Sequence, residues 1–333
     1  MKFKVKSDFV QNSIKPYELV RQSCAKRAGS LAHLSIDQEA VVRFSEKIAN
    51  LPRDIVGTVD ADMFYLHDDP SMRIYYVLIA DSINFGSGWF PLLKKTDGKS
   101  GAVSLAIALS KYCKINSIPS PHELRSLTID DVATIFDQDP RGEVGQLLDL
   151  YRVGLFQLGD FLIERFDGNV MYLLEEANSS AAKFISLIST IPFFNDVAIE
   201  GGVVTYFYKR AQITASDIAL VSKDDLATFE DLDRLTIFAD NVLPNLLRVE
   251  GVLRYSEDLN QRIASQELFA PGSSQEVELR AATVVACEQI VENLQNNHQV
   301  TISPRELDQL LWTMGREKVY KDSPRHRCRC TYY

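Results

Sequence analysis

The feature that most constrains this chain is a series of long segments with apolar residues at helical spacing. Residues 143–166 and 170–191 carry the two longest patterns, and Gly168 and Pro192 stand where these helices should end. The fold is therefore expected to be mainly α-helical. Further helices are expected at residues 16–28, 37–51, 99–115, 229–248, 257–266 and 275–296, near Ser120 and Thr128, and from the Ser303-Pro-Arg-Glu306 capping box to about Gly315.

Strand signals are few, and nothing in the sequence divides the chain into separate units. Residues 203–207 are β-branched and aromatic and follow two glycines, which favours a strand. Residues 63–65 and 74–79 fit either a buried strand or a helix. Because there is no internal repeat and no linker rich in proline or glycine, residues 1–333 are expected to form one domain with two helical lobes.

The composition excludes several classes of protein. A share of 46% hydrophobic residues is too high for a disordered chain. No apolar run approaches the roughly 20 residues that span a membrane. Lysine and arginine number 36 against 45 acidic residues, so the broad basic surface that grips a polynucleotide is not expected. A small-molecule substrate remains open, and the sequence does not determine the oligomeric state.

The cysteines indicate a reducing compartment. There are 5 of them, an odd number at scattered positions, and residues 1–9 lack the apolar centre of a secretory signal. A cytoplasmic protein is therefore expected. Cys328 and Cys330, with His326 nearby, suggest a metal site, but no second pair of ligands precedes them, so neither a metal nor a cofactor is expected.

Glycines and aromatic residues gather at residues 81–90, which include Asn84, Phe85 and Trp89. Glycines allow the backbone to approach a ligand closely, and aromatic rings offer flat faces. The cluster therefore suits a planar heterocycle. The alternative interpretation is a tight turn whose aromatic residues belong to the core.

Charged residues interrupt two apolar stretches. Lys209 and Arg210 follow the expected strand at 203–207, where they either bind a phosphate or carboxylate or are solvated at the strand end. Asp240 lies in an apolar segment, and such a carboxylate must be paired or take part in chemistry. The alternative for Asp240 is a helix cap, since Pro244 lies four residues on.

The C-terminal part of the chain combines an acidic helix face with a basic tail. Asp308 and Trp312 are four residues apart and so share a helix face, and Arg316 follows them. The final Tyr-Tyr favours a docked tail over a solvated one. Alternation would place three arginines of the tail on one side of an extended strand: Arg325, Arg327 and Arg329.

Six motifs follow one another along the chain: Asp81-Ser-Ile-Asn-Phe-Gly-Ser-Gly-Trp-Phe90, Tyr208-Lys-Arg-Ala-Gln-Ile213, Leu235-Thr-Ile-Phe-Ala-Asp240, Gly251-Val-Leu-Arg-Tyr-Ser256, Leu311-Trp-Thr-Met-Gly-Arg316 and His326-Arg-Cys-Arg-Cys-Thr-Tyr-Tyr333. Together they resemble the queuosine salvage protein family, the queuosine 5'-phosphate N-glycosylase/hydrolases. The resemblance implies a mainly helical fold similar to that of the helix-hairpin-helix DNA glycosylases. It also implies hydrolysis of the N-glycosidic bond of queuosine 5'-monophosphate, which releases queuine for salvage into tRNA modification.

The resemblance implies roles for individual residues. Asp240 matches the family's catalytic carboxylate, and Phe238 matches an aromatic residue that contacts the base. His33 matches a base-contacting histidine over a short stretch, and Asp308 matches an acidic residue near the base. Where the family often has threonine between the tail arginines, this chain has two cysteines.

The chemistry of the implied reaction fits one essential carboxylate. Breaking an N-ribosyl bond builds positive charge on the sugar, which a nearby carboxylate stabilises or attacks. Queuine is a 7-deazaguanine without a basic N7, so the leaving base needs help at another edge or from hydrogen bonds to its growing negative charge. Its secondary amine is cationic at neutral pH, and Asp308 suits either that amine or the guanine-like edge of the base. Lys209 and Arg210 suit the 5'-phosphate, or Lys209 orients Asp240.

One alternative function is a nucleic-acid glycosylase or a helical module that binds nucleotides or nucleic acid, which the acidic composition opposes. The other is a non-catalytic helical scaffold or tRNA-modification partner, which would tolerate Asp240→Asn. Under the enzymatic interpretation, the expected catalytic residues are Asp240 and Lys209. The expected substrate-binding residues are His33, Asn84, Phe85, Trp89, Arg210, Phe238, Asp308 and Arg316.

Overall fold

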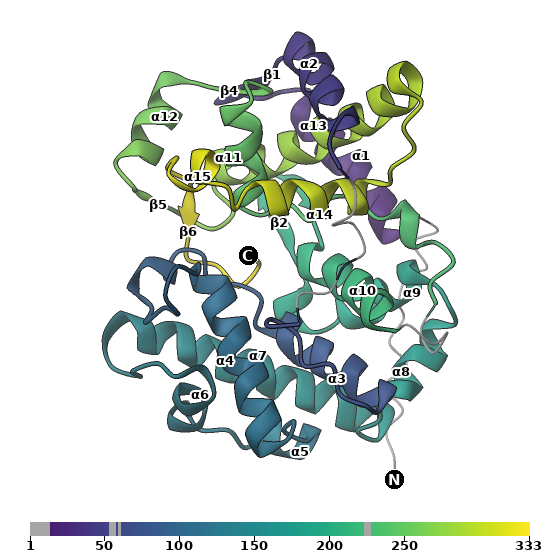
Figure 1. Ribbon diagram of the computed structural model, residues 1–333, viewed down its shortest axis with the longest axis vertical. Coiled ribbons are helices and arrows are strands. Elements are labelled where there is room, and N and C mark those ends of the chain that lie inside the picture. Colours follow the sequence, from purple (N-terminus) through teal and green to yellow (C-terminus); the bar gives the residue numbers. More distant parts are fainter. Residues whose placement is uncertain (1–13, 53–57, 59–60, 223–227) are drawn as a thin grey trace.

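The computed structural model describes residues 14–52, 58, 61–222 and 228–333 (Figure 1). This part of the chain forms fifteen α-helices and six short strands, so the protein is mainly α-helical, as predicted. No helix in the described ranges is long and apolar enough to cross a membrane. Residues 1–9, on which the argument about a secretory signal rests, lie outside the described residues.

The buried apolar side chains form two large clusters, which define two lobes. The first lobe, at the bottom of Figure 1, packs around the 25-residue helix α7. Its α-helices are α3 (Pro70–Ser82), α4 (Gly101–Asn116), α5 (Pro121–Leu124), α6 (Ile129–Phe136), α7 (Gly142–Phe166), α8 (Val170–Ala177), α9 (Ala181–Ile188) and α10 (Lys209–Val221). Its short 3-10 helices are η1 (Phe90–Leu92), η2 (Pro192–Phe194) and η3 (Leu232–Arg234).

The second lobe packs around another 25-residue helix, α13 (Ser274–His298), and lies at the top of Figure 1. Helices α1 (Pro16–Ala28) and α2 (Gln38–Ala49) pack against α13, so the N-terminal helices join the C-terminal half of the chain. The remaining helices of this lobe are α11 (Val242–Val249), α12 (Glu257–Ala264), α14 (Pro304–Met314) and α15 (Lys318–Lys321).

The strands form three two-stranded pairs within the described residues. Strands β1 (Leu34–Ile36) and β4 (Leu253–Tyr255) are antiparallel, as are β2 (Val197–Glu200) and β3 (Val203–Tyr206). Strands β5 (Leu268–Phe269) and β6 (Arg327–Cys328) are parallel. The prediction of a strand at residues 203–207 is thus confirmed by β3.

Two long helices expected from the sequence are interrupted. The pattern at 170–191 is divided between α8 and α9, because Asn178 and Ser179 adopt left-handed backbone angles with φ of 50° and 56°. The expected helix at 229–248 is confined to η3 and α11, since residues 235–241 have no helical structure. The ambiguous segment at 74–79 is helical and belongs to α3.

Residues 235–241, which we call the central segment, run between the two lobes. Phe238 belongs to the core of the first lobe, whereas its neighbours Ile237 and Ala239 belong to the core of the second. Successive side chains of an extended segment point to opposite sides, so one short stretch can join both cores. This arrangement brings Asp240 to the boundary between the lobes. The single domain and the likeness to DNA glycosylases stay predictions.

Candidate active site

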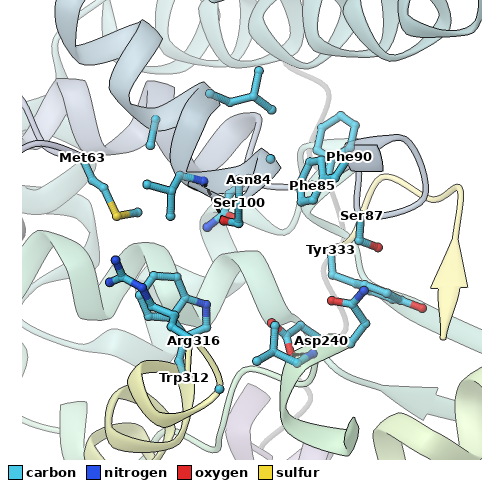
Figure 2. A pocket seen from close by; sticks show the side chains of 18 of the residues that line it. Met63, Asn84, Phe85, Ser87, Phe90, Ser100, Asp240, Trp312, Arg316 and Tyr333 are labelled. Atoms are coloured by element: carbon cyan, nitrogen blue, oxygen red, sulfur yellow. Dashed lines mark hydrogen bonds between the residues drawn. The ribbon is translucent and has the colours of Figure 1, made fainter. Parts of the chain in front are cut away.

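A cavity of about 1320 Å³ is lined by residues of both lobes. The first lobe contributes the turn after α3, the start of α4 and one side of α10. The second lobe contributes α14 and residues 321–327, and the central segment lies between them. Figure 2 shows Asn84 and Phe85 of the turn after α3, Asp240 of the central segment and Trp312 of α14 around this space.

Asp240 lines the cavity at the end of the central segment (Figure 2). Its Oδ1 accepts hydrogen bonds from the backbone amides of Val242 and Leu243, at 2.7 and 3.2 Å. These amides open α11, so one oxygen caps a helix while the residue also faces the cavity. Among the described residues no hydrogen bond reaches Oδ2, which leaves that oxygen for a ligand.

Lys209 is the first residue of α10 and is only 5% exposed. Its Nζ donates a hydrogen bond to the backbone oxygen of Asn84 at 3.5 Å. Burial lowers the pKa of Lys209, and the carboxylates of Asp240 and Asp81 oppose that shift. Among the described residues Lys209 and Asp240 form no direct ion pair, so their charges interact at longer range around the same cavity.

Phe238 and Asp308 lie side by side at the cavity wall. The Oδ1 of Asp308 accepts a hydrogen bond from the backbone amide of Phe238 at 2.8 Å. Burial raises the pKa of Asp308 to about 8, and the charge of Asp240 acts in the same direction, against this hydrogen bond and Lys209. Asp308 is therefore mainly protonated at neutral pH. In this form its Oδ2 can carry the proton and donate a hydrogen bond.

The turn at residues 81–90 divides its aromatic residues between the cavity and the core. Asn84 and Phe85 line the cavity, and Gly86 allows the turn with a φ of 114°. A Cβ at Gly86 would lie 2.7 Å from a methyl group of Leu147, so only glycine fits there. Trp89, predicted to bind substrate, lies outside the cavity lining because it is buried against the Arg329 guanidinium, 5.3 Å from its ring.

Arg210 does not line the cavity, in contrast to the sequence-based prediction of a phosphate ligand. It is 1% exposed, and its guanidinium donates to the backbone oxygens of Asp81, Ser82 and Phe193. The group also lies against the ring of Phe85, 4.9 Å from the centroid. Arg210 thus stabilises the turn at 81–90, and its donors are directed away from the cavity.

His33 is likewise absent from the cavity lining. It directly precedes β1 in the second lobe, and its backbone oxygen accepts a hydrogen bond from the amide of Ser256 at 2.8 Å. Its backbone amide donates to the carboxylate of Glu278 at 2.9 Å. The predicted contact between His33 and a base in this cavity therefore does not follow from the structure.

The C-terminal tail, residues 324–333, docks against the turn at 81–90. The backbone oxygen of Tyr333 accepts hydrogen bonds from the amides of Gly86 and Ser87, and its side chain is 3% exposed. The docking inferred from the sequence is therefore confirmed. Arg325 and Arg327 line the cavity, whereas Arg329 is directed to Glu143 and Trp89.

Helix α14 presents one side to the cavity. Asp308 and Trp312 both line it, which confirms that they share a helix face. Arg316 lies one turn farther on, exposed, with its guanidinium 5.2 Å from the ring of Trp312 (Figure 2). The sequence-based prediction thus located this wall of the cavity.

Comparison with known proteins identifies the family. The family model described as queuosine salvage protein matches residues 64–333. The chain belongs to the queuosine salvage protein family. It is 32% identical to the queuosine 5'-phosphate N-glycosylase/hydrolase of Sphaerobacter thermophilus over 90% of this chain and 92% of that protein. The proteins of the same name from Mus musculus and Dictyostelium discoideum are 31% and 26% identical, over 78% and 96% of this chain and 81% and 99% of theirs.

The part of the chain that matches the family includes the predicted site residues that line the cavity. They are Asn84, Phe85, Lys209, Phe238, Asp240, Asp308 and Arg316. His33 precedes the residues that the family model matches, and it does not line the cavity.

Asp217 is a cavity residue that the sequence reasoning missed. It lies two turns after Lys209 on α10 and is partly buried. Burial raises its pKa well above the ordinary value, and the nearby carboxyl of Asp81 adds to that effect. Helix α10 is buried on most sides and mixes polar with apolar residues there, so the sequence lacks the regular apolar spacing that marks a helix.

No group of three or more potential metal ligands occurs among the described residues. Cys328 and Cys330 are buried in the docked tail, and the nearby His326 directs one ring nitrogen to the hydroxyl of Tyr333 at 3.2 Å. These three side chains therefore belong to the packing of the tail.

Proposed function

We propose that this protein hydrolyses the N-glycosidic bond of queuosine 5'-monophosphate and releases queuine. The observation that carries the proposal is the carboxylate of Asp240, of which only Oδ1 is bound by backbone amides among the described residues. It faces a cavity that is also lined by the buried Lys209 and by Phe238. The family match and the names of the relatives agree with this reaction. The cavity is large enough for a nucleotide.

Asp240 acts on the ribose. As the bond to the base breaks, positive charge develops at the anomeric carbon, and the free Oδ2 of Asp240 stabilises it or attacks it. The amides of Val242 and Leu243 hold Oδ1, so the carboxylate does not have to reorient during the reaction. Before the sugar becomes cationic, the positive charge of Lys209 partly balances the negative charges of Asp240 and Asp81.

Asp308 acts on the base. Queuine has no basic N7, so the departing electron pair must be stabilised at another position of the ring system. Asp308 is protonated at neutral pH and keeps Oδ1 on the Phe238 amide, so its other oxygen donates to the base. Asp240 and Asp308 thus form a pair in which one carboxyl is charged and the other is neutral.

The position of Phe238 allows its ring to stack on the base. We expect Phe238→Ala to weaken queuine binding by about 1–3 kcal/mol, the usual contribution of an aromatic platform. Isothermal calorimetry with free queuine measures this directly. Phe238→Leu keeps most of the apolar volume and should show the same direction of change. Phe156→Ala, on an exposed surface of α7, is the matched control, and equal affinity of the parent and Phe238→Ala would contradict the stacking.

The 5'-phosphate lies at the basic end of the cavity. Arg325 has one donor on the backbone oxygen of Gly315 at 2.9 Å, and Arg327 makes no side-chain hydrogen bond or ion pair among the described residues. Both side chains lie on the cavity side of the tail. Burial lowers the pKa of Arg325, and the negative charge of Asp240 opposes that shift. A ribose at Asp240 therefore directs its phosphate toward these two arginines.

Two tail arginines make a matched test of the phosphate site. Arg327→Gln should lower kcat/KM for queuosine 5'-monophosphate by about 10- to 100-fold, since a hydrogen bond to a charged group contributes about 1.5–3 kcal/mol. The value for the nucleoside queuosine should stay unchanged. Arg329→Gln removes a charge of the same tail that points to Glu143, and it should affect neither substrate. Equal losses on both substrates would place the phosphate elsewhere.

The overall proposal is tested with purified protein and queuosine 5'-monophosphate. Chromatography with mass detection should show queuine and ribose 5-phosphate in equal amounts. A non-catalytic nucleotide-binding module would bind the substrate and return it intact, and that result would remove the proposed reaction.

A further inference from the structure

A buried ion pair, outside the cavity lining, joins helix α13 of the second lobe to the segment that precedes β2. The guanidinium of Arg280 on α13 contacts both carboxylate oxygens of Asp196, at 3.0 and 2.5 Å. The two residues are 1% and 2% exposed, and Arg280 also lies 3.9 Å from the centroid of the Phe207 ring. Glu276 approaches the same guanidinium at 3.5 Å.

Asp196 holds the start of α10. Its backbone oxygen accepts hydrogen bonds from the amides of Phe207 and Tyr208, at 3.0 and 3.1 Å. Its carboxylate accepts a third from the amide of Lys209 at 3.1 Å. Tyr208 has a left-handed φ of 48°, a conformation that a non-glycine residue keeps only when its surroundings hold it. Asp196 therefore fixes the position of the Lys209 backbone and, with it, the origin of the Lys209 side chain.

Arg280 holds the central segment. Its Nε donates a hydrogen bond to the backbone oxygen of Ala239 at 3.0 Å. Ala239 lies between Phe238 and Asp240, and the neighbouring Phe238 amide has its own partner in Asp308. The backbone that carries Asp240 is thus held by Arg280 on one side of Ala239 and by the first amides of α11 on the other.

We propose that Arg280 and Asp196 are positioning residues that set the distance between Asp240 and Lys209. This inference rests on the proposed function. A single ion pair connects the backbone of both residues, although neither of its members lines the cavity. Misplacing a reacting group by about 1 Å can cost on the order of 10²-fold in rate, so a connection of this kind affects catalysis without contacting the substrate.

The geometry requires arginine at position 280. A guanidinium has five donors in a fixed planar fork, which allows Nε to reach Ala239 while the two terminal nitrogens reach Asp196. A lysine at this position keeps the positive charge beside Asp196 but has one nitrogen and no fork. Arg280→Lys therefore removes the hydrogen bond to Ala239 but keeps a positive charge beside the buried carboxylate of Asp196.

The test compares Arg280→Lys with Arg27→Lys. Arg27 is 8% exposed and pairs with Glu200, and neither residue lines the cavity, so its replacement is a matched loss of a buried arginine. We expect Arg280→Lys to lower kcat by about 10²-fold and to change the Kd for queuine less than about threefold, because Asp308 still holds Phe238. Arg27→Lys should keep the parent kcat even if its Tm falls as far as that of Arg280→Lys.

Two further measurements decide between positioning and a structural role. Asp196→Asn should lower kcat in the same direction while queuine still binds. Equal kcat values for Arg280→Lys and the parent would overturn the inference, as would a proportional loss of kcat and queuine binding. If the parent protein releases no queuine, the proposed function fails, and a crystal structure of Arg280→Lys still tests the positioning. Asp240 displaced relative to Lys209 supports it, and an unmoved Asp240 contradicts it.

Discussion

Asp240→Asn is expected to release queuine about 10²–10⁴ times more slowly than the parent protein, the effect of losing about 3–5 kcal/mol of transition-state stabilisation. Asparagine has nearly the same shape, and its oxygen can still accept the hydrogen bonds from Val242 and Leu243. What disappears is the negative charge opposite the sugar. Single-turnover rates with queuosine 5'-monophosphate measure this loss without interference from product release.

The binding of free queuine gives the internal control for this variant. The charge of Asp240 acts on the ribose, so the Kd for the base should change far less than the rate. Asp97→Asn removes an exposed carboxylate at the rim of the same cavity and should leave the rate at the parent level. If Asp240→Asn turns over as fast as the parent, Asp240 is only a helix cap, and the catalytic carboxylate must be another acid such as Asp308.

The second large effect is expected in the dependence of the rate on pH. The pKa of Asp308 is raised to about 8 by burial, with a contribution from Asp240, so Asp308 carries its proton at neutral pH. A proton donor works only in this form. The rate of queuine release should therefore fall as the pH rises through about 8. A profile of kcat against pH records the decline.

Asp308→Asn should remove this decline together with most of the rate. Asparagine can accept the hydrogen bond from the Phe238 amide but cannot transfer a proton, so we expect a rate about 10²–10⁴-fold lower, the usual contribution of general acid catalysis. Glu306→Gln, at the capping box of the same helix, serves as the control variant. An Asp308→Asn protein that keeps the alkaline decline would show that another group titrates there.

The same pKa shift predicts a change in stability. Because the pKa of Asp308 is higher in the folded protein than in the unfolded chain, the free energy of unfolding should decrease as pH rises from about 4 to about 8. Asp308→Asn removes the buried charge that forms at alkaline pH. Urea titrations above pH 8 should therefore find this variant at least as stable as the parent, although it is less active.

Local signals in the sequence predicted most helices and several residues of the cavity. The capping box from Ser303 to Glu306 is present at the start of α14, and α1 spans the residues expected for it. The spacing of Asp308 and Trp312 was sufficient to place both on one wall of the cavity. In each case the decisive interaction joins residues within one or two helical turns, which a sequence records directly.

Neighbouring residues with the same charge show what the sequence could not decide. Lys209 and Arg210 are adjacent, and each was predicted to act in the site. Successive residues of a helix point about 100° apart. Lys209 therefore faces the cavity, while Arg210 faces three backbone oxygens of the core. Which direction is the core depends on the helices packed around α10, and these come from other parts of the chain.

The sequence by itself determined a mainly helical protein and its family, and it predicted that Asp240, Phe238 and Asp308 belong to the active site. Tertiary structure alone decided that Trp89 is buried beneath the tail and that His33 lies outside the cavity lining. It also decided that Arg280 reaches Ala239 across 41 positions of sequence. The physical reason is that helix formation depends on neighbours a few residues apart, whereas burial and charge pairing depend on which distant elements pack together.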